Sequence, residues 1–313
     1  MSLSAIVSQY ITYKQSMGMR FHTEARTLKS FCKTMGDVGI AEVQPDRVQA
    51  FLAGTGPITR FWHRKHEALR GFYRFAIARS YGAVSPLPSR APQPPHAFVP
   101  YIFSYEELRR LLDTAASSAS HWRSHIQPHT CRMLILLLYG AGLRISEALS
   151  LTLGDINLTG GILTIRESKF YKTRLVPMGP DLLRALTRYA TQRAMDHPAK
   201  TDDRLLVSRT GTPVTRQTAE NTFGRLRVRA GVLRHDGARY QPRLHDLRHA
   251  FAVHRVVSWY RQGADVQRLL PKLATYLGHV HIAATQRYLT LTPELLKEAS
   301  RRFEHYAGEG RHE

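Results

Sequence analysis

Six side chains of the types that phosphoryl transfer requires stand in short, recognisable stretches of the sequence. They are Arg144 in GLRISEAL, Lys169 in SKFYKTRLVPM, His245 and Arg248 in LHDLRHAF, His279 in YLGH and Tyr288 in TQRYL. An arginine can donate two parallel hydrogen bonds to phosphate oxygens, which a lysine cannot. A tyrosine phenol can attack phosphorus while histidine or lysine moves protons. Together they indicate chemistry on a phosphodiester.

Each of these residues also has an ordinary explanation when it is taken alone. Arg144 could sit at a helix end and pair with Glu147, three residues further on. Lys169 falls in a predicted hairpin turn, where exposed lysines are common. Gly278 could cap a helix in the left-handed conformation, and Tyr288 is one of 14 tyrosines. The six residues occur together, in a fixed order and at characteristic spacings, and this combination favours a functional role for them.

The sequence contains no convincing metal or nucleotide site. His245 and His249 have the spacing of a metal-binding pair, but the glutamate of a zinc hydrolase helix and a third ligand are missing. A glycine-rich loop of the G-x-x-x-x-G-K-[ST] form is also absent. We therefore expect neither a metal nor a cofactor.

From about residue 101 to residue 307 the sequence resembles the catalytic domain of the tyrosine recombinase, or phage integrase, family. All six residues occur in family order, with family spacing from His245 to Arg248 and from His279 to Tyr288. The resemblance assigns Arg144 as the first catalytic arginine, Lys169 as the lysine of the β-hairpin, His245 and Arg248 as the H-x-x-R box, His279 as the histidine of LGH and Tyr288 as the nucleophile.

Two stretches depart from the usual family pattern. The hairpin reads SKFYKTRLVPM where a glycine-flanked lysine is frequent, so Lys172 is a rival to Lys169. Alignment on RLVPM favours Lys169. The segment between the H-x-x-R box and LGH is longer than the usual helix-turn-helix spacing, which affects the expected loop geometry.

The resemblance implies a site-specific recombinase that acts on double-stranded DNA carrying a specific recombination site. Arg144 and Arg248 would clamp the phosphodiester, and His245 would accept the proton of Tyr288. Lys169 would protonate the leaving 5′-oxygen, and His279 would bind a non-bridging oxygen. The product would be a 3′-phosphotyrosyl enzyme with a free 5′-hydroxyl, so that rejoining needs no ATP.

In the family, strand exchange takes place in a homotetramer on two DNA sites, in integration, excision, inversion or resolution. A predicted last helix, Thr292 to Tyr306, has an apolar stripe that could dock on a neighbour or on its own domain. Two other functions stay open: DNA relaxation by a type IB topoisomerase, and regulation by a DNA-binding protein without catalysis. The complete set of six residues argues against the second.

Composition agrees with a nucleic-acid partner. The chain has 313 residues with 45 Lys plus Arg against 24 Asp plus Glu, a formal charge of +21. Its two cysteines cannot form a disulfide framework, and its longest apolar stretch is too short to span a bilayer. We therefore expect a cytoplasmic, nucleoid-associated protein without a membrane partner.

The residues that carry this chemistry follow a separate N-terminal region. Six prolines in PLPSRAPQPPHAFVP predict an extended linker at residues 86–100, after a helical domain at residues 1–85 that resembles the family's core-binding domain. The domain's last predicted helix, Thr59 to Tyr81, has an apolar face of Phe61, Trp62, Ala68, Leu69, Phe72, Phe75 and Ala76. Its opposite face carries a candidate DNA-binding set, Arg60, Arg64, Arg70 and Arg74.

Residues 101–313 are expected to form a mainly helical catalytic domain with one small sheet. Ser104 and Glu107 have the spacing of a capping box, and helical patterns follow at about 131–139, 145–149, 180–195, 215–230, 248–259 and 265–277. Short apolar alternations between Ile156 and Met178 predict three antiparallel strands. The expected class is mainly α (α+β), with an all-helical N-terminal domain.

Overall fold

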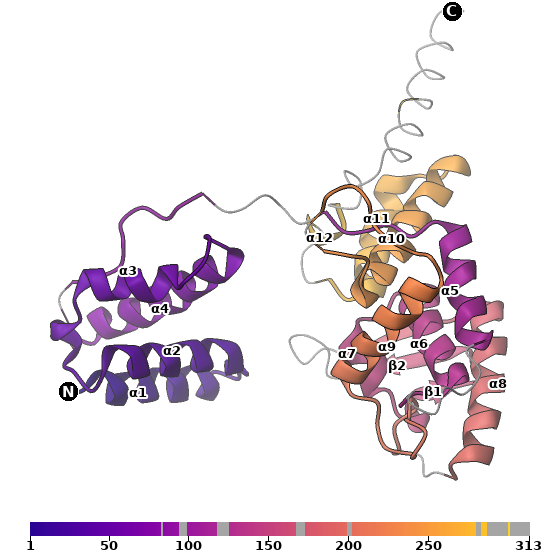
Figure 1. Cartoon of the computed structure of the whole chain (residues 1–313), viewed down its shortest axis with the longest axis horizontal. Coiled ribbons are helices and arrows are strands. Elements are labelled where there is room, and N and C mark those ends of the chain that lie inside the picture. The colour runs from indigo at the N-terminus through magenta and orange to yellow at the C-terminus, as the bar shows by residue number, and fades with distance from the viewer. Residues whose placement is uncertain are drawn as a thin grey trace, which may run out of the picture. The chain divides into compact units, whose positions relative to one another are not determined.

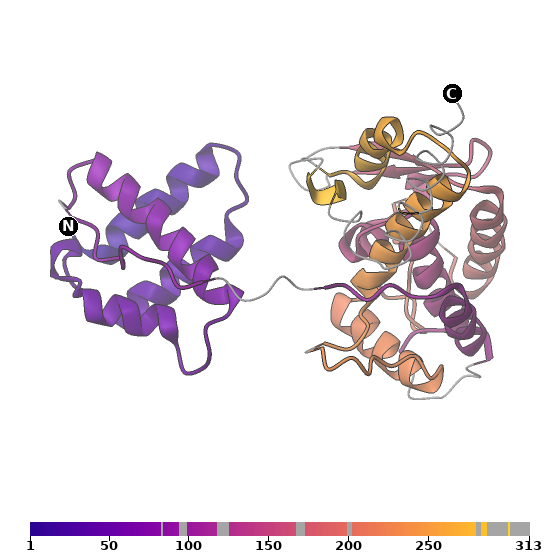
Figure 2. The ribbon, with the colours of Figure 1, turned by 90° about the horizontal axis from the view of Figure 1, so that it is seen from above.

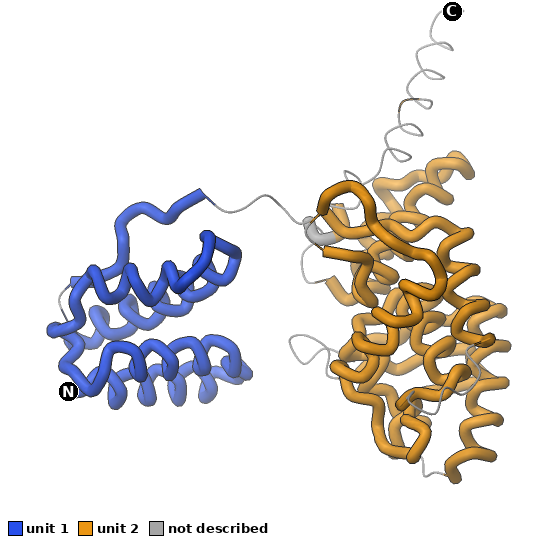
Figure 3. The backbone as a smooth tube through the Cα atoms, in the orientation of Figure 1, with its two compact units in different colours: residues 1–98 blue, residues 99–313 orange. Residues whose placement is uncertain are grey.

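The computed structural model describes residues 1–82, 84–93, 99–117, 125–166, 173–198, 202–238, 240–279, 283–286 and 300. The chain divides into two compact units, residues 1–98 and 99–313 (Figure 3). Each unit has an apolar core of its own. The described part of the predicted linker, residues 86–93 and 99–100, contains neither helix nor strand.

In the described part of the first unit every element is a helix. Its elements are α1 (Leu3–Ser16), α2 (His22–Met35), the 3-10 turn η1 (Ile40–Glu42), α3 (Pro45–Ala53) and α4 (Arg60–Ala78). Helix α1 packs beside α2, and α3 packs beside α4 (Figure 1). Leu28, Phe31 and Phe72 are fully buried in the core between them.

Helix α4 begins at Arg60, one residue after the predicted start at Thr59. The Thr59 hydroxyl accepts a hydrogen bond from the Phe61 backbone N–H at 3.2 Å, which caps the first turn. One part of the predicted apolar face is wrong, because the Phe61 side chain is 54% exposed. Tyr73, which lies beside that face, is instead buried. Trp62, in the same turn, is buried in the core, so Phe61 lies at the edge of the apolar face and the helical period alone misplaces it.

The second unit combines helices with one small sheet. Its elements are α5 (Tyr105–Ser117), α6 (Pro128–Gly140), α7 (Ile145–Ser150), η2 (Leu153–Asp155), β1 (Ile156–Asn157), β2 (Ile162–Ile165), β3 (Arg174–Pro177), α8 (Pro180–Asp196), α9 (Arg216–Arg229), α10 (Leu244–Arg261), α11 (Val266–Leu277) and α12 (Ala283–Gln286). The strands form one antiparallel sheet in the order β1-β2-β3. The predicted class, mainly helical with a small three-stranded sheet, is confirmed.

Helix α6 is the centre of the second unit. It packs against α5, α8, α9 and α10, and Leu137 and Leu138 are completely buried. Figure 2 shows these helices from a second direction. Because α6 is apolar on nearly all sides, it forms a fixed support from which the chain leaves at Gly140 toward α7.

Two helix starts in this unit bear on the site. The predicted capping box of α5 is present, with the Glu107 backbone N–H 3.1 Å from the Ser104 hydroxyl. Helix α10 begins at Leu244, four residues before the predicted start at 248. The Asp246 carboxylate accepts the Arg243 backbone N–H at 2.9 Å, and this cap places His245 and Arg248 in the first turns of the helix.

In the parts of the chain that the structure describes, no helix combines the length and the apolar character needed to span a membrane.

Candidate active site

A buried carboxylate, that of Glu147 in α7, lies among three arginines. Its Oε1 accepts Arg144 Nη1 at 2.7 Å and Arg174 Nη1 at 2.9 Å, and its Oε2 accepts Arg174 Nη2 at 2.8 Å. Arg248 Nη1 lies 3.8 Å from Oε2. Burial alone would raise the pKa of the Glu147 carboxyl, but the hydrogen bonds and charge of Arg174, with the charge of Arg248, hold it at about 2. The carboxylate is therefore ionised and fixes the arginines.

The end of helix α11 holds the same three arginines from another side. Three successive backbone carbonyls accept one hydrogen bond each: Tyr276 O from Arg174 Nε at 2.9 Å, Leu277 O from Arg248 Nη2 at 2.5 Å and Gly278 O from Arg144 Nη2 at 2.9 Å. The last carbonyls of a helix lack partners within it and carry partial negative charge. The helix end therefore acts as a second anchor for the three guanidinium groups.

Two glycines let the chain approach these arginines closely. Gly142 has φ +59°, and a Cβ atom there would lie 2.6 Å from Phe251 Cδ1. Its carbonyl accepts Arg248 Nη1 at 2.5 Å. Gly278 ends α11 in the left-handed conformation, and a Cβ atom there would lie 2.9 Å from Arg174 Nη1. The glycines of GAGLR and LGH are thus part of the packing that assembles the cluster.

The two predicted histidines lie beside this cluster. His279 directly follows the end of α11, and its Nδ1 lies 2.7 Å from the Thr285 hydroxyl. Burial, followed by the charges of Arg248 and Arg144, lowers the pKa of His279 to about 4. The same causes lower the pKa of His245, although the residue is partly exposed to solvent. Both rings are therefore neutral at pH 7 in the DNA-free protein.

The structure thus brings four of the six predicted residues together: Arg144, His245, Arg248 and His279. The pair of Arg144 with Glu147, first considered as an ordinary helix-end contact, is present and belongs to this cluster. Lys169, its rival Lys172 and Tyr288 lie outside the described residues. Apart from residue 300, the predicted last helix at 292–306 also lies outside them.

Arg174 belongs to this cluster, although the sequence analysis assigned it no role. The signal is the alternation of strand β3, in which Leu175 is 61% exposed while Val176 is buried. Arg174 shares the inner side of the strand with Val176, because side chains alternate along a strand. An arginine placed inward in a strand requires a carboxylate partner, which Glu147 supplies.

The candidate DNA-binding arginines of the first unit have different surroundings. Arg60, Arg64, Arg70 and Arg74 are all exposed along α4. Arg70 pairs with Glu67 at 3.1 Å. For the other three, the structure's described contacts include no carboxylate, as expected of a surface that meets a polyanion.

The described ranges contain no group of three histidine, cysteine, aspartate or glutamate side chains placed to hold a metal ion. His245 and His249, which have metal-pair spacing in the sequence, instead have rings 4.7 Å apart in an edge-to-face contact.

Known proteins resemble this chain over nearly its whole length. The phage integrase family profile matches residues 102–294. A Sinorhizobium fredii protein whose name places it among the integrases or recombinases (y4rB) is 34% identical over 95% of this chain and 96% of its own length. The tyrosine recombinase XerC of Azotobacter vinelandii is 32% identical over 78% of this chain and 74% of its own.

Solved structures share the fold. The Tn1549 transposon integrase in complex with transposon right end DNA matches 98% of this chain and 100% of that one, with a TM-score of 0.69 and 16% identity. A lambda integrase tetramer bound to a Holliday junction matches 92% of this chain and 77% of its own, with a TM-score of 0.66 and 17% identity. On the family profile and the sequence relatives, the chain belongs to the phage integrase family of tyrosine recombinases.

Proposed function

We propose that this site-specific DNA recombinase uses Tyr288 to attack one strand of double-stranded DNA, with the Glu147 cluster as its phosphate-binding centre. The phenolic oxygen of Tyr288 forms a bond to phosphorus, and the bond from phosphorus to the 5′-oxygen breaks. The strand is held as a 3′-phosphotyrosyl ester and a 5′-hydroxyl is released. Attack by a 5′-hydroxyl of the partner duplex reverses the step and joins the exchanged strands.

The observation that carries this proposal is the anchoring of two predicted catalytic arginines by one carboxylate and one helix end. Arg144 uses Nη1 for Glu147 and Nη2 for the Gly278 carbonyl. A guanidinium has five N–H donors, so the described contacts of Arg144 leave donors for phosphate oxygens. Such fixed donors stabilise the charge that develops on the equatorial oxygens in the transition state.

Arg248 is the second half of the clamp and is covered in the DNA-free structure. The residue is 1% exposed, and its guanidinium binds the carbonyls of Gly142 and Leu277. A phosphate therefore reaches Arg248 only after neighbouring groups move. We expect DNA binding to cause this movement, because a phosphate offers stronger charge-assisted hydrogen bonds than a carbonyl.

Proton transfer falls to the remaining residues. The phenol of a tyrosine has a pKa of about 10, so Tyr288 needs an acceptor, and a neutral His245 can accept its proton. Lys169 follows strand β2 and would protonate the leaving 5′-oxygen. His279, neutral and oriented by Thr285, would donate to a non-bridging oxygen.

Arg174 acts in this proposal as a positioning residue. It does not need to touch the phosphate, since its Nε donates to the Tyr276 carbonyl and its Nη1 and Nη2 donate to Glu147. It joins strand β3, which follows the segment carrying Lys169, to α7 and α11. The three arginines and the end of α11 are thereby tied to one support.

We further propose a homotetramer on two DNA sites, working on nucleoid DNA without metal or ATP. The lambda integrase tetramer bound to a Holliday junction, which shares the fold, supports the stoichiometry. Cleavage and joining should persist in EDTA, whereas two-metal nucleases stop. Relaxation of supercoiled DNA without exchange of strands would instead favour a topoisomerase.

A substrate with sulfur in place of the bridging 5′-oxygen tests the assignments directly. A thiol has a pKa of about 8.5 and water one of about 15.7, so a sulfur leaving group departs without a proton. Lys169→Ala should cleave the oxygen substrate poorly and the sulfur substrate nearly as well as the unmodified enzyme does. Arg248→Ala should be defective on both, because the clamp is lost whichever atom leaves.

Lys172→Ala is the matched control, three residues along the same segment. It should show no selective rescue by sulfur. Rescue of Lys172→Ala, with none for Lys169→Ala, would move the general acid to Lys172. Defects of both variants that sulfur leaves unchanged would overturn general-acid catalysis by either lysine.

A further inference from the structure

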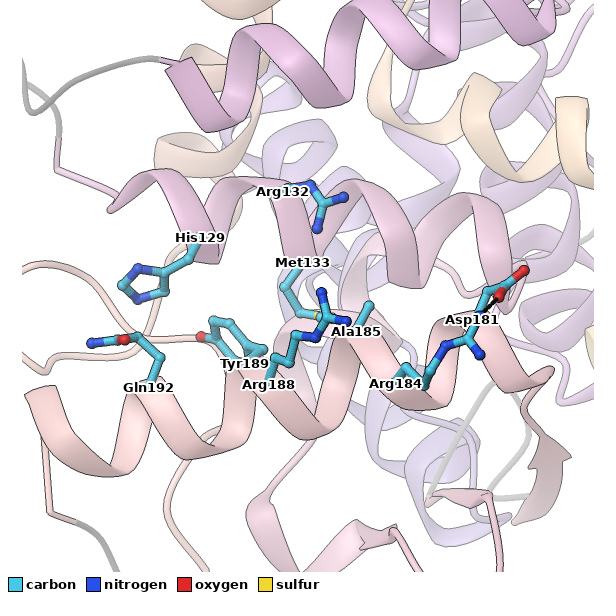
Figure 4. Close-up of a pocket in the computed structure, with 9 residues that line it drawn as sticks. All are labelled: His129, Arg132, Met133, Asp181, Arg184, Ala185, Arg188, Tyr189 and Gln192. Carbon is cyan, nitrogen blue, oxygen red and sulfur yellow. Dashed lines mark hydrogen bonds and ion pairs between the residues drawn. The ribbon is translucent and has the colours of Figure 1, made fainter.

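A groove of about 520 Å³ lies between α6 and α8, and basic side chains line it from both helices (Figure 4). Helix α6 contributes His129 and Arg132, and α8 contributes Arg184 and Arg188. The side chain of Arg132 on α6 and the side chain of Arg188 on α8 point toward one another (Figure 4). None of the residues lining the groove belongs to the Glu147 cluster.

The cations of the groove differ in their partners. Arg184 pairs with Asp181, one turn earlier on α8, and His129 Nε2 lies 3.4 Å from Asp196 Oδ2. Arg132 and Arg188 have no carboxylate partner within the described residues. Two positive groups therefore face each other across the groove with no negative group between them.

This arrangement is unfavourable unless an anion joins it. Like charges on neighbouring turns and facing helices repel each other. The floor of the groove is apolar, since Met133 and Tyr189 are almost fully buried and the Tyr189 hydroxyl already donates to the Leu205 carbonyl at 3.1 Å. A low-dielectric floor strengthens both the repulsion and the attraction of an anion.

The donors suit a phosphate. Each guanidinium presents a planar fork of N–H groups whose spacing matches two oxygens of a phosphate. Two forks that face each other can hold one phosphate from both sides.

We propose, on the basis that the chain is a DNA recombinase but independently of its catalytic assignments, that the groove between Arg132 and Arg188 binds a backbone phosphate of DNA. The contact is separate from the Glu147 cluster and adds to affinity without taking part in strand cleavage. A free phosphate ion has the same chemistry and is the alternative ligand.

The test uses the full chain, labelled so that NMR follows the Nε–H groups of Arg132 and Arg188. Inorganic phosphate and a duplex DNA of arbitrary sequence are added in separate titrations. We expect both Nε–H signals to shift with either ligand, and the shift with DNA to saturate at lower ligand concentration. If neither ligand moves the two signals, the groove is not a phosphate site.

Variants then separate DNA from free phosphate. Arg132→Gln and Arg188→Gln should each flatten the dependence of log K for duplex DNA on log salt by about 0.9, the slope that one neutralised phosphate contributes. Arg184→Gln is the control, because it removes the same charge four residues away on the same helix. Arg184 is already paired with Asp181, so the slope of log K on log salt should change less in this variant. The Nε–H signals could shift with inorganic phosphate while neither Arg132→Gln nor Arg188→Gln changes the salt dependence of DNA binding. That result would contradict the DNA contact and identify a site for free phosphate.

Discussion

The arginines around Glu147 and those of α4 carry the same charge in opposite surroundings. Arg174 and Arg248 are at most about one-tenth exposed as side chains and are fixed by a carboxylate and by helix-end carbonyls. Arg60, Arg64 and Arg74 are exposed on one helix face. The first set is oriented before DNA arrives, whereas the second must order its side chains when DNA binds.

The difference separates catalysis from affinity. A guanidinium whose position is fixed can favour the transition state over the bound substrate, which is what raises a rate. An exposed arginine releases counterions on meeting a phosphate and adds affinity that salt weakens. We therefore expect changes in the Glu147 cluster to alter stability and rate, and changes on α4 to alter binding and its salt dependence.

The largest effect should follow Glu147→Gln, which keeps the shape of the side chain and removes its charge. Three arginines would then lose their shared anion in a buried site, and the free energy of unfolding should fall by about 3–5 kcal/mol. Urea unfolding of the DNA-free chain measures it. Glu67→Gln on α4, which removes an exposed pair with Arg70, should cost less than about 1 kcal/mol. Equal losses for the two variants would contradict the comparison.

A smaller effect should appear as pH dependence of stability. The pKa of His279 is about 4 in the folded chain, lowered by burial and by Arg248 and Arg144, and about 6.5 when unfolded. The unfolded chain therefore gains a proton first as pH falls. The contribution of His279 to the free energy of unfolding should decrease between pH 6.5 and 4 by at most about 1.4 kcal/mol per pH unit, and be constant above that window.

Unfolding curves across this range, compared with those of His279→Gln, measure the contribution. The variant should have a shallower pH dependence over the same window. An identical slope in the chain with and without His279 would show that the ring is not held neutral by the cluster.

The smallest effect should come from single arginines of α4. Arg64→Gln should weaken DNA binding and flatten its salt dependence by about 0.9, with the rate of cleavage at saturating DNA unchanged. Arg70→Gln should change binding less, because Arg70 is already paired with Glu67. Filter binding at several salt concentrations gives the slope. A lower rate at saturating DNA with unaltered affinity would place α4 in the catalytic machinery.

The sequence predicts the catalytic residues around Glu147 better than it predicts the groups that hold them in place. Arg144, His245, Arg248 and His279 are visible because their motifs are short and local. Arg174 and the α11 carbonyls are not, because their partners lie between 27 and 134 residues away along the chain. Which carbonyls meet which arginines depends on how α11 packs against β3 and α7, and one sequence holds no signal for that packing. The predicted start of α10 is wrong for a local reason, the cap formed by Asp246.

The structure also bears on which tyrosine can act as nucleophile. The Tyr276 hydroxyl donates to the Pro177 carbonyl at 3.2 Å, and burial raises the pKa of Tyr276. Its proton is therefore held by a backbone partner and costly to remove. Tyr276 is consequently a poor candidate for attack on phosphorus.

The most direct test of the central claim is the covalent adduct between the chain and DNA. A labelled duplex carrying inverted repeats taken from the DNA beside the encoding gene is incubated with the chain and run on a denaturing gel. The unmodified chain should give a slowly migrating protein–DNA band that persists in EDTA. Tyr288→Phe should bind the duplex with equal affinity and give no band. A band that persists in Tyr288→Phe would contradict the assignment of the nucleophile, and with it the mechanism proposed for this site.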